Sequence, residues 1–373
     1  MLNYGLIPRG WPRYHRPDFR SGVQGLPWGL TPFIKYQFCD SLMLDMKTKF
    51  SHKPVMLDEV LFAFEYLSKL KNAIFVDGTL GLGGHASAIA DELKVKSLAY
   101  RQAGEKNKVI GIDKDEAALN TAGLRIKNKK LNKYFTLVRD DFSNIKKILA
   151  ELDIEKVDGI LLDLGVSSMQ LDDKSRGFSF EDKDQLLDMR MDKTQHKDAE
   201  YILNNYPKHD LENVLRGGEE KFYKKIALNV IEKRKKSRIK TVGELLDIIS
   251  AVYPMKLKAK KTNFATDTFR ALRLEVNDEI SNLDRSIQDM IDILEVGGRL
   301  AIISFHSLED RIVKHKFRAL ENPCICPPKQ PYCTCGKKPS IKILTKKPII
   351  PSDEEIAENS RARSAKLRIA QKV

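Results

Sequence analysis

A glycine-rich stretch, FVDGTLGLGGH over residues 75–85, constrains this chain more than any other part of its sequence. A short apolar run ends at an acid, Asp77, passes through four glycines and continues with helical spacing, so we expect strand, tight turn and helix in that order. Glycines let a backbone turn sharply and approach a ligand, and a helix N-terminus offers unpaired N–H groups. The stretch therefore predicts a nucleotide-type ligand site, although the same pattern also occurs in turns that bind nothing.

Three further segments repeat the pattern of an apolar strand that ends in an acid. They are KVIGID (108–113), YFTLVRDDF (134–142) and VDGILLD (157–163). In doubly wound α/β folds the acid at the tip of the second strand accepts hydrogen bonds from ribose hydroxyls, which is the role we predict for Asp113. The alternative is that Asp113 only caps the following helix. Four such strands predict a βαβαβ half whose strand ends bind the ligand.

Composition and charge restrict the class of protein and its partners. The 373 residues, 42% of them hydrophobic, allow two or three domains with a sizeable core. No apolar run approaches the ~20 residues that cross a bilayer, so we expect a cytoplasmic protein without a membrane partner. The net charge of +14 is concentrated, because residues 208–261 hold 15 Lys and Arg against 7 acids and residues 311–373 hold 15 against 5. These two basic blocks favour a polyanionic partner, for which RNA is the first candidate and a membrane surface the second, and we predict RNA.

Four of the five cysteines stand close together, in CICPPKQPYCTC over residues 324–335. Five cysteines in a chain of this length do not make a disulfide framework. Two C-x-C pairs could hold a tetrahedral zinc, although C-x-x-C is the commoner spacing, and reduced thiols in a tight proline-rich loop are the alternative. From the sequence we adopt the second interpretation and assign no metal ligand to Cys324, Cys326, Cys333 or Cys335.

Longer motifs give the sequence a specific family resemblance. They are DLGVSSMQLD (163–172), RGFSF (176–180), LDMRMD (187–192), SFHSLEDR (304–311) and RSAKLRIA (363–370). With the stretches above, they resemble the MraW family, the ribosomal RNA small subunit methyltransferase H group, over roughly residues 52–372. The resemblance implies an enzyme that uses S-adenosylmethionine (SAM) to methylate N4 of a cytidine in the decoding region of 16S rRNA. It implies 16S rRNA as the partner, within the small ribosomal subunit. It does not decide between naked RNA and the assembled subunit as the substrate, nor does it fix the oligomeric state, for which a homodimer is one option.

The same resemblance implies a set of site residues. Those that contact the cofactor are Gly83, Gly84, His85, Asp113, Phe142, Asp163 and Gln170, with Phe142 beside the adenine. From the residues alone, Phe142 could equally be core packing and Gln170 a surface loop residue. Transfer of a methyl group from a sulfonium needs positioning rather than a nucleophilic side chain. The cytosine amine is a poor nucleophile that an acceptor facing its N–H would sharpen, so Asp163 is the catalytic candidate, with the cofactor, the amine or both as its partner.

We expect a class I, Rossmann-like α/β methyltransferase fold with a seven-stranded sheet and an inserted all-helical domain. Residues 46–192 form the first part of the methyltransferase domain, 193–262 a basic helical insertion that binds RNA, and 263–373 the second part. In this second part a long helix over residues 268–294 leads into the fifth strand, and an antiparallel pair closes the sheet. Residues 1–45 lack helical or strand periodicity and precede the family-like sequence, so we expect a poorly ordered leader from a start codon placed too far upstream. The polar loop 165–192 is long enough to be an active-site loop.

Three other functions fit parts of the sequence. A dinucleotide oxidoreductase would need regular G-x-G-x-x-G spacing, which the turn lacks. A non-catalytic ribosome assembly factor would be expected to lose the cofactor glycines or Asp113, which this chain keeps. A DNA amino-methyltransferase fits on chemistry alone, and comparing RNA with DNA as acceptors would separate it. One departure from the family is NFATD at residues 263–267. Asp267 stands there in place of a basic residue, so the contact of this position with RNA stays undecided.

Overall fold

The structure is a computed structural model of the 373-residue chain. It describes residues 53–99, 107–180, 182–258, 264–327, 330 and 332–373. The chain divides into residues 1–46 and 47–373, and all described residues belong to the second unit. The predicted leader, residues 1–45, lies outside the described residues. None of the helices in the described part of the chain is both long and apolar enough to span a membrane.

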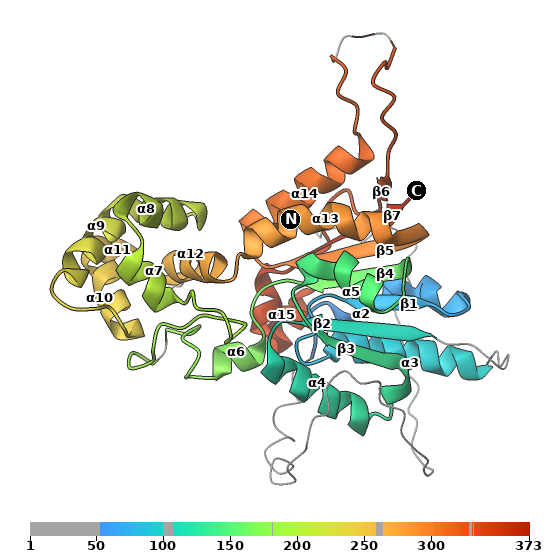
Figure 1. The fold of residues 1–373 in the computed structure, drawn as a ribbon, viewed down its shortest axis with the longest axis horizontal. Helices are drawn as coiled ribbons and strands as arrows, with labels where there is room; N and C mark the ends of the chain where they lie inside the picture. The colour runs from blue at the N-terminus through green and yellow to red at the C-terminus, as the bar shows by residue number, and fades with distance from the viewer. Residues whose placement is uncertain (1–52, 100–106, 181, 259–263, 328–329, 331) are drawn as a thin grey trace, which may run out of the picture. The chain divides into compact units, whose positions relative to one another are not determined.

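Seven strands form one mixed sheet in the order β3-β2-β1-β4-β5-β7-β6 (Figure 1). Their bounds are Ile74–Asp77 (β1), Lys108–Asp113 (β2), Phe135–Arg139 (β3), Val157–Asp163 (β4), Leu294–Ser304 (β5), Ile341–Ile343 (β6) and Lys366–Lys372 (β7). Strands β1 to β5 pair in parallel, whereas β7 runs antiparallel to both β5 and β6. The predicted seven-stranded α/β fold, closed by antiparallel pairing, is confirmed.

Helices cover both faces of the sheet, which is why its central strands are apolar throughout. On β4, Leu161 packs into one hydrophobic cluster and Ile160 and Leu162 into another, since successive side chains point to opposite faces. The first cluster includes residues of α2 (Leu57–Phe64), α3 (Gly84–Ala99) and α4 (Glu116–Asn128). The second includes residues of α5 (Ile145–Glu151), α13 (Glu279–Ile293) and α14 (Ser307–Glu321). The carboxyl ends of the parallel strands therefore lie along one edge of the sheet, between the two layers of helices.

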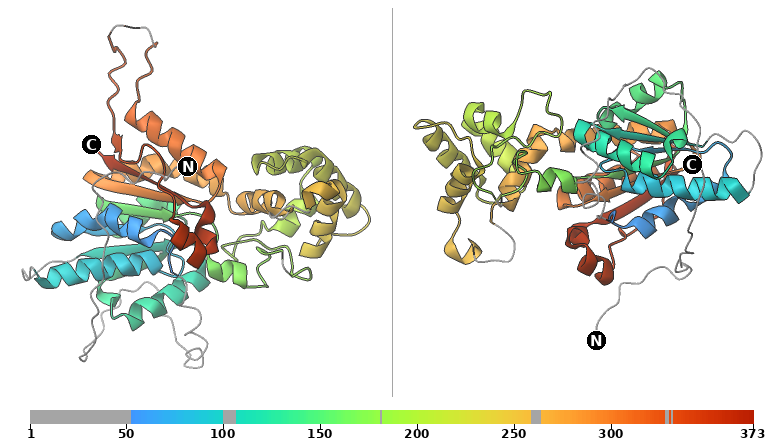
Figure 2. Two further views of the ribbon diagram at one scale, coloured as in Figure 1. Left: turned by 180° about the vertical axis from the view of Figure 1, so that it is seen from behind. Right: turned by 90° about the horizontal axis from the view of Figure 1, so that it is seen from below.

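A third hydrophobic cluster is built from helices and a long irregular segment. Its helices are α7 (Ala199–Asn205), α8 (Lys208–Gly217), α9 (Tyr223–Arg234), α10 (Val242–Val252) and α12 (Thr266–Val276), to which residues 178–191 add apolar side chains. In both views of Figure 2 these helices pack on one another rather than on the sheet. Short elements complete the fold: α6 (Ser168–Asp172), α11 (Met255–Lys258), α15 (Asp353–Glu358) and 3-10 turns η2 (Glu65–Lys69), η3 (Asn132–Tyr134), η4 (Phe142–Asn144) and η5 (Ser360–Ser364).

The single helix predicted over residues 268–294 is wrong, because the chain breaks it into α12 and α13. Asp278 adopts a left-handed conformation with φ of 50°. The preceding Asn277 is buried, and its side chain accepts a hydrogen bond from the Met191 N–H at 2.8 Å and donates one to the Met189 carbonyl at 2.8 Å. The break lets α12 pack with the helical cluster while α13 packs on the sheet.

Candidate active site at the carboxyl ends of the strands

A cavity of about 450 Å³ lies at the carboxyl ends of β1, β2 and β4. Six of the seven residues predicted to hold a cofactor line it: Gly84, His85, Asp113, Phe142, Asp163 and Gln170. Gly83 is not among the lining residues. Sequence segments far apart contribute the other walls, among them Asn282 and Leu283 of α13 and residues 359–364 near the C-terminus. The parallel β-strands bring these segments together because their carboxyl ends share one edge.

The two glycines at the start of α3, Gly83 before it and Gly84 as its first residue, meet different local demands. Gly83 has φ of 70°, a conformation that side chains other than glycine rarely adopt. A Cβ atom on Gly84 would lie 2.5 Å from Pro54 Cγ, so glycine here allows the segment before α2 to approach the start of α3. Together they place the N-terminus of α3 beside the cavity.

Asp113 ties the glycine turn to the tip of β2. Its Oδ2 accepts a hydrogen bond from the Gly81 N–H at 2.7 Å, and its Oδ1 accepts one from the Asp115 N–H at 2.8 Å. Burial raises the pKa of Asp113 to about 6, against the lowering effect of these two hydrogen bonds. The alternative that Asp113 only caps the next helix is wrong, because Asp115 is the N-cap of α4 and accepts from the Ala117 N–H at 3.1 Å.

Asp163, at the tip of β4, carries a carboxylate oxygen without a partner. Its Oδ1 is buried and has no hydrogen-bond partner within the described ranges. Its Oδ2 lies 3.6 Å from His85 Nδ1. Burial, followed by the charges of Asp77 and Glu309, raises the pKa of Asp163 well above its ordinary value. A buried polar atom that lacks a partner at the wall of a cavity is a candidate for ligand contact.

His85 faces Asp163 as a neutral ring. Its Nε2 lies 2.8 Å from the Val55 carbonyl oxygen, which can only accept, so Nε2 carries the proton. Burial lowers the pKa of His85 to about 4. At neutral pH the lone pair of Nδ1 therefore points toward the Asp163 carboxyl.

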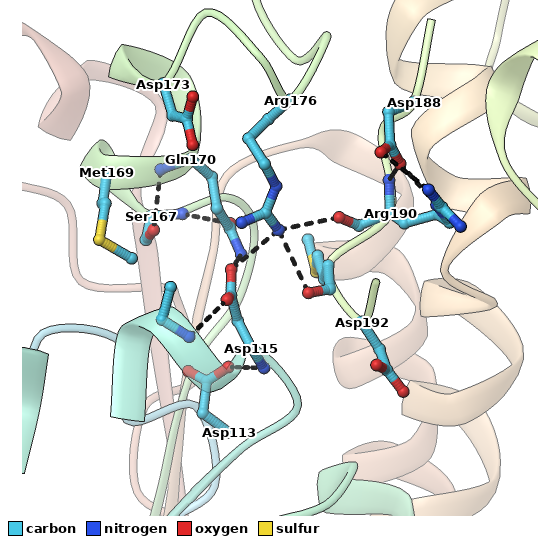
Figure 3. Close-up of polar contacts among 12 residues, drawn as sticks. Asp113, Asp115, Ser167, Met169, Gln170, Asp173, Arg176, Asp188, Arg190 and Asp192 are labelled. Atoms are coloured by element: carbon cyan, nitrogen blue, oxygen red, sulfur yellow. Dashed lines mark hydrogen bonds and ion pairs between the residues drawn. The ribbon is translucent and has the colours of Figure 1, made fainter. Parts of the chain in front are cut away.

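Gln170 anchors the loop 165–192 to the start of α4 (Figure 3). It is only 4% exposed, so it is not a surface residue. Its Nε2 donates to Asp115 Oδ2 at 2.8 Å, and its Oε1 accepts from the Ser167 N–H at 2.9 Å in the capping box of α6. Arg176 Nη2 donates to the same Asp115 oxygen at 2.9 Å. These two hydrogen bonds fix the loop to Asp115, which stands two residues beyond the end of β2.

Comparison with known proteins decides the family. A family model described as the MraW methylase family matches residues 49–373. This chain belongs to that family. A relative in Clostridium botulinum (strain 657 / Type Ba4), named ribosomal RNA small subunit methyltransferase H, is 48% identical over 87% of this chain and 100% of its own length. One in Agathobacter rectalis, named ribosomal RNA small subunit methyltransferase H 2, is 45% identical over 87% of this chain and 99% of its own. The solved structure of an rRNA methylase from Streptococcus thermophilus aligns with a TM-score of 0.35 at 13% identity, covering 84% of this chain and 95% of that one.

Three residues that matter in this MraW methylase are absent from the set predicted from its sequence. Asp115 and Arg176 form the buried ion pair that holds the loop, and Glu309 lines the cavity from the start of α14. Glu309 Oε1 lies 3.0 Å from His306 Nε2, and this contact helps to lower the pKa of Glu309 although the carboxylate is buried. Arg176 and Glu309 stand within the RGFSF and SFHSLEDR motifs, but a motif does not say which partner a charged residue has.

Proposed function

We propose that this member of the MraW methylase family uses SAM to methylate the 16S rRNA of the small ribosomal subunit, at N4 of a cytidine in the decoding region. The observation that carries the chemical part is Asp163, whose Oδ1 stands buried and unpartnered among the described residues beside the cavity. The relatives that match over their whole length bear the name ribosomal RNA small subunit methyltransferase H, which supports the substrate. The proposed site of action is the cytoplasm.

The cavity fits the proposed cofactor in size and in charge. Its volume of about 450 Å³ falls within the range of ligand sites. Each Asp113 oxygen accepts one backbone N–H and keeps a second lone pair, so the carboxylate can also accept hydroxyl hydrogens from a ribose. Phe142, half-buried at the wall, offers an apolar surface to the adenine. When bound, SAM supplies a methyl group on a sulfonium, and Gly83, Gly84, His85 and Gln170 shape its binding site.

Asp163 is the proposed acceptor for the amine of the target base. The raised pKa of its carboxyl makes it a stronger base than an ordinary aspartate. An ionised Oδ1 can accept a hydrogen bond from the amine N–H, and this contact strengthens as the nitrogen becomes positively charged during transfer. His85 Nδ1 lies 3.6 Å from Oδ2, beyond hydrogen-bond distance, and leaves Oδ1 to the amine.

The basic helices are the proposed contact for RNA. We retain the division into residues 46–192, 193–262 and 263–373, with the middle part as the RNA-binding insertion. After α9 this part exposes Lys235, Lys236 and Lys240. A base inside a duplex cannot reach a buried cavity, so the target nucleotide must be unpaired or swung out. Lysines beside the loop would hold flanking phosphates without reading the sequence.

The substrate class is tested by offering several acceptors to the purified protein with SAM. Small ribosomal subunits from cells lacking this protein, the 16S rRNA extracted from them, and DNA of the same sequence serve as the three arms. Transfer to the subunits or the rRNA, with none to DNA, is the expected result. Transfer to DNA alone would replace the proposal with the DNA amino-methyltransferase alternative.

A further inference from the structure

Four thiols converge where the chain crosses from α14 to β6. Cys324 and Cys326 lie on the outgoing leg of this crossing and Cys333 and Cys335 on the returning leg, in the projection at the end of α14 in Figure 1. All four are free thiols, and their Sγ atoms all lie within 4.8 Å of one another. Cys333 Sγ is 3.7 Å from that of Cys324 and 3.9 Å from that of Cys326. Cys335 Sγ is 3.5 Å from that of Cys333 and 3.8 Å from that of Cys324.

These separations match the edges of a tetrahedron around a metal ion. With metal–sulfur bonds of about 2.3 Å, as in structural zinc sites, the edges of a regular tetrahedron are about 3.8 Å. A disulfide would instead bring two sulfurs to about 2.0 Å. Thiols are weak hydrogen-bond donors and acceptors, so mutual hydrogen bonding gives little reason for four of them to gather. Two C-x-C pairs can complete a four-coordinate site because each leg supplies two thiolate ligands.

Besides the thiols, the described residues of the crossing are held by a few hydrogen bonds, among them the one from Gln330 Nε2 to Thr334 Oγ1 at 2.9 Å. Near the cysteines two large apolar side chains, Ile325 and Tyr332, are 70% and 83% exposed, so no hydrophobic core forms there. Among the described residues of the crossing, backbone hydrogen bonds lie at its base, from the Ser340 N–H to the Leu320 carbonyl, and at its tip, from the Gln330 N–H to the Pro327 carbonyl. Small substructures without a core are commonly held by a metal.

Local features suit thiolate ligands. The Thr334 N–H donates to Cys326 Sγ at 3.3 Å, and such bonds orient metal ligands. Gly336 turns the chain directly after Cys335 with φ of 65°, where a Cβ would meet nothing within 4 Å, so conformation rather than space calls for glycine. Exposed Lys337 and Lys338 follow and oppose the net negative charge of four thiolates around a divalent ion.

We propose that Cys324, Cys326, Cys333 and Cys335 bind one Zn²⁺ ion, which ties the two legs of the α14–β6 crossing together. A tetrahedral set of four thiolates is typical of zinc and of iron–sulfur centres, and zinc is the redox-inactive choice for a site that only ties two legs together. This proposal takes the zinc alternative in place of the loop of reduced thiols adopted from the sequence. None of the four cysteines lines the cavity. The zinc proposal therefore does not depend on the proposed activity.

Elemental analysis of the full chain, purified without chelators from zinc-supplemented cells, tests this directly. We expect about one zinc per chain, lost in the double variant Cys324→Ser/Cys333→Ser and kept in the matched control Cys39→Ser, which removes the fifth cysteine. A second measurement needs no variant: wild-type protein stripped of metal and given Co²⁺ should show thiolate-to-cobalt charge-transfer absorption and the visible bands of tetrahedral cobalt. SAM binding should persist in the double variant. A zinc content near zero in wild type, equal zinc in the double variant, or a Cys324–Cys333 disulfide in the freshly purified protein would overturn the proposal.

Discussion

Arg176 Nη2 lies 2.9 Å from Asp115 Oδ2, and neither side chain is more than 4% exposed. The same nitrogen donates to the carbonyls of Arg190 and Met191, so one guanidinium links the middle of the loop and its C-terminal end to the start of α4 (Figure 3). Asp115 in turn donates its N–H to Asp113. The loop over the cavity and the acid proposed to bind ribose therefore belong to one hydrogen-bonded network.

Replacing Arg176 with methionine should destabilise the protein by about 3–5 kcal/mol, because it leaves the Asp115 carboxylate buried without its cation. Urea denaturation monitored by circular dichroism measures the change. Lys129→Met is the matched control, since Lys129 pairs with Asp91 at 2.6 Å on the surface, with both side chains about 40% exposed, and should cost less than about 1 kcal/mol. Equal losses in the two variants would show that the buried pair has no special weight.

Asp113→Ala should weaken SAM binding by about 1–3 kcal/mol, because it removes a charged acceptor from a buried site. Isothermal titration gives the affinity, and Asp91→Ala, which removes a surface carboxylate, is the control. An unchanged affinity in Asp113→Ala would exclude its assignment to the ribose. A parallel denaturation curve separates this effect from loss of the turn that Asp113 holds through Gly81.

SAM affinity should fall as the pH drops below about 6, the pKa of Asp113 in the free protein. Binding a cation and ribose hydroxyls favours the ionised carboxylate, so below this pH binding must first release a proton. The loss approaches about tenfold per pH unit and disappears above the pKa. Titrations between pH 5 and 8 measure the slope, and Asp113→Asn should flatten it. A wild-type profile without slope would mean that Asp113 does not change its protonation on binding.

Lys235→Glu, Lys236→Glu and Lys240→Glu together should weaken RNA binding and reduce its dependence on salt, since each lost phosphate contact lowers the slope by about one. Arg234 is left intact because it donates to the carbonyls of Leu203 and Tyr206 and supports the helical packing. Fluorescence anisotropy over a salt series measures both quantities. The control is Lys147→Glu, an exposed residue of α5. A triple variant that binds RNA like the control at every salt concentration would contradict this contact.

The sequence predicted those parts of the fold that depend on local pattern. The apolar runs ending at Asp77, Asp113 and Asp163 became the parallel strands that border the cavity, because a short apolar run followed by turn residues indicates a buried strand. The division of α12 from α13 was not predictable, since Asn277 ends the helix by bonding to Met189 and Met191, which are distant in sequence. Gln170 was found by resemblance, but its partner Asp115 depends on a tertiary contact that no spacing reveals.

The central claim is that Asp163 accepts a hydrogen bond from a cytosine amine while the methyl group is transferred. The most direct measurement is the rate at which SAM and the purified protein methylate small ribosomal subunits from cells that lack it, with the modified nucleoside identified by mass spectrometry. We expect N4-methylcytidine at one decoding-region position, a rate at least about 100-fold lower for Asp163→Asn, and SAM affinity within a few-fold of wild type. A methyl group on another atom, or an Asp163→Asn variant that works at the wild-type rate, would contradict the account.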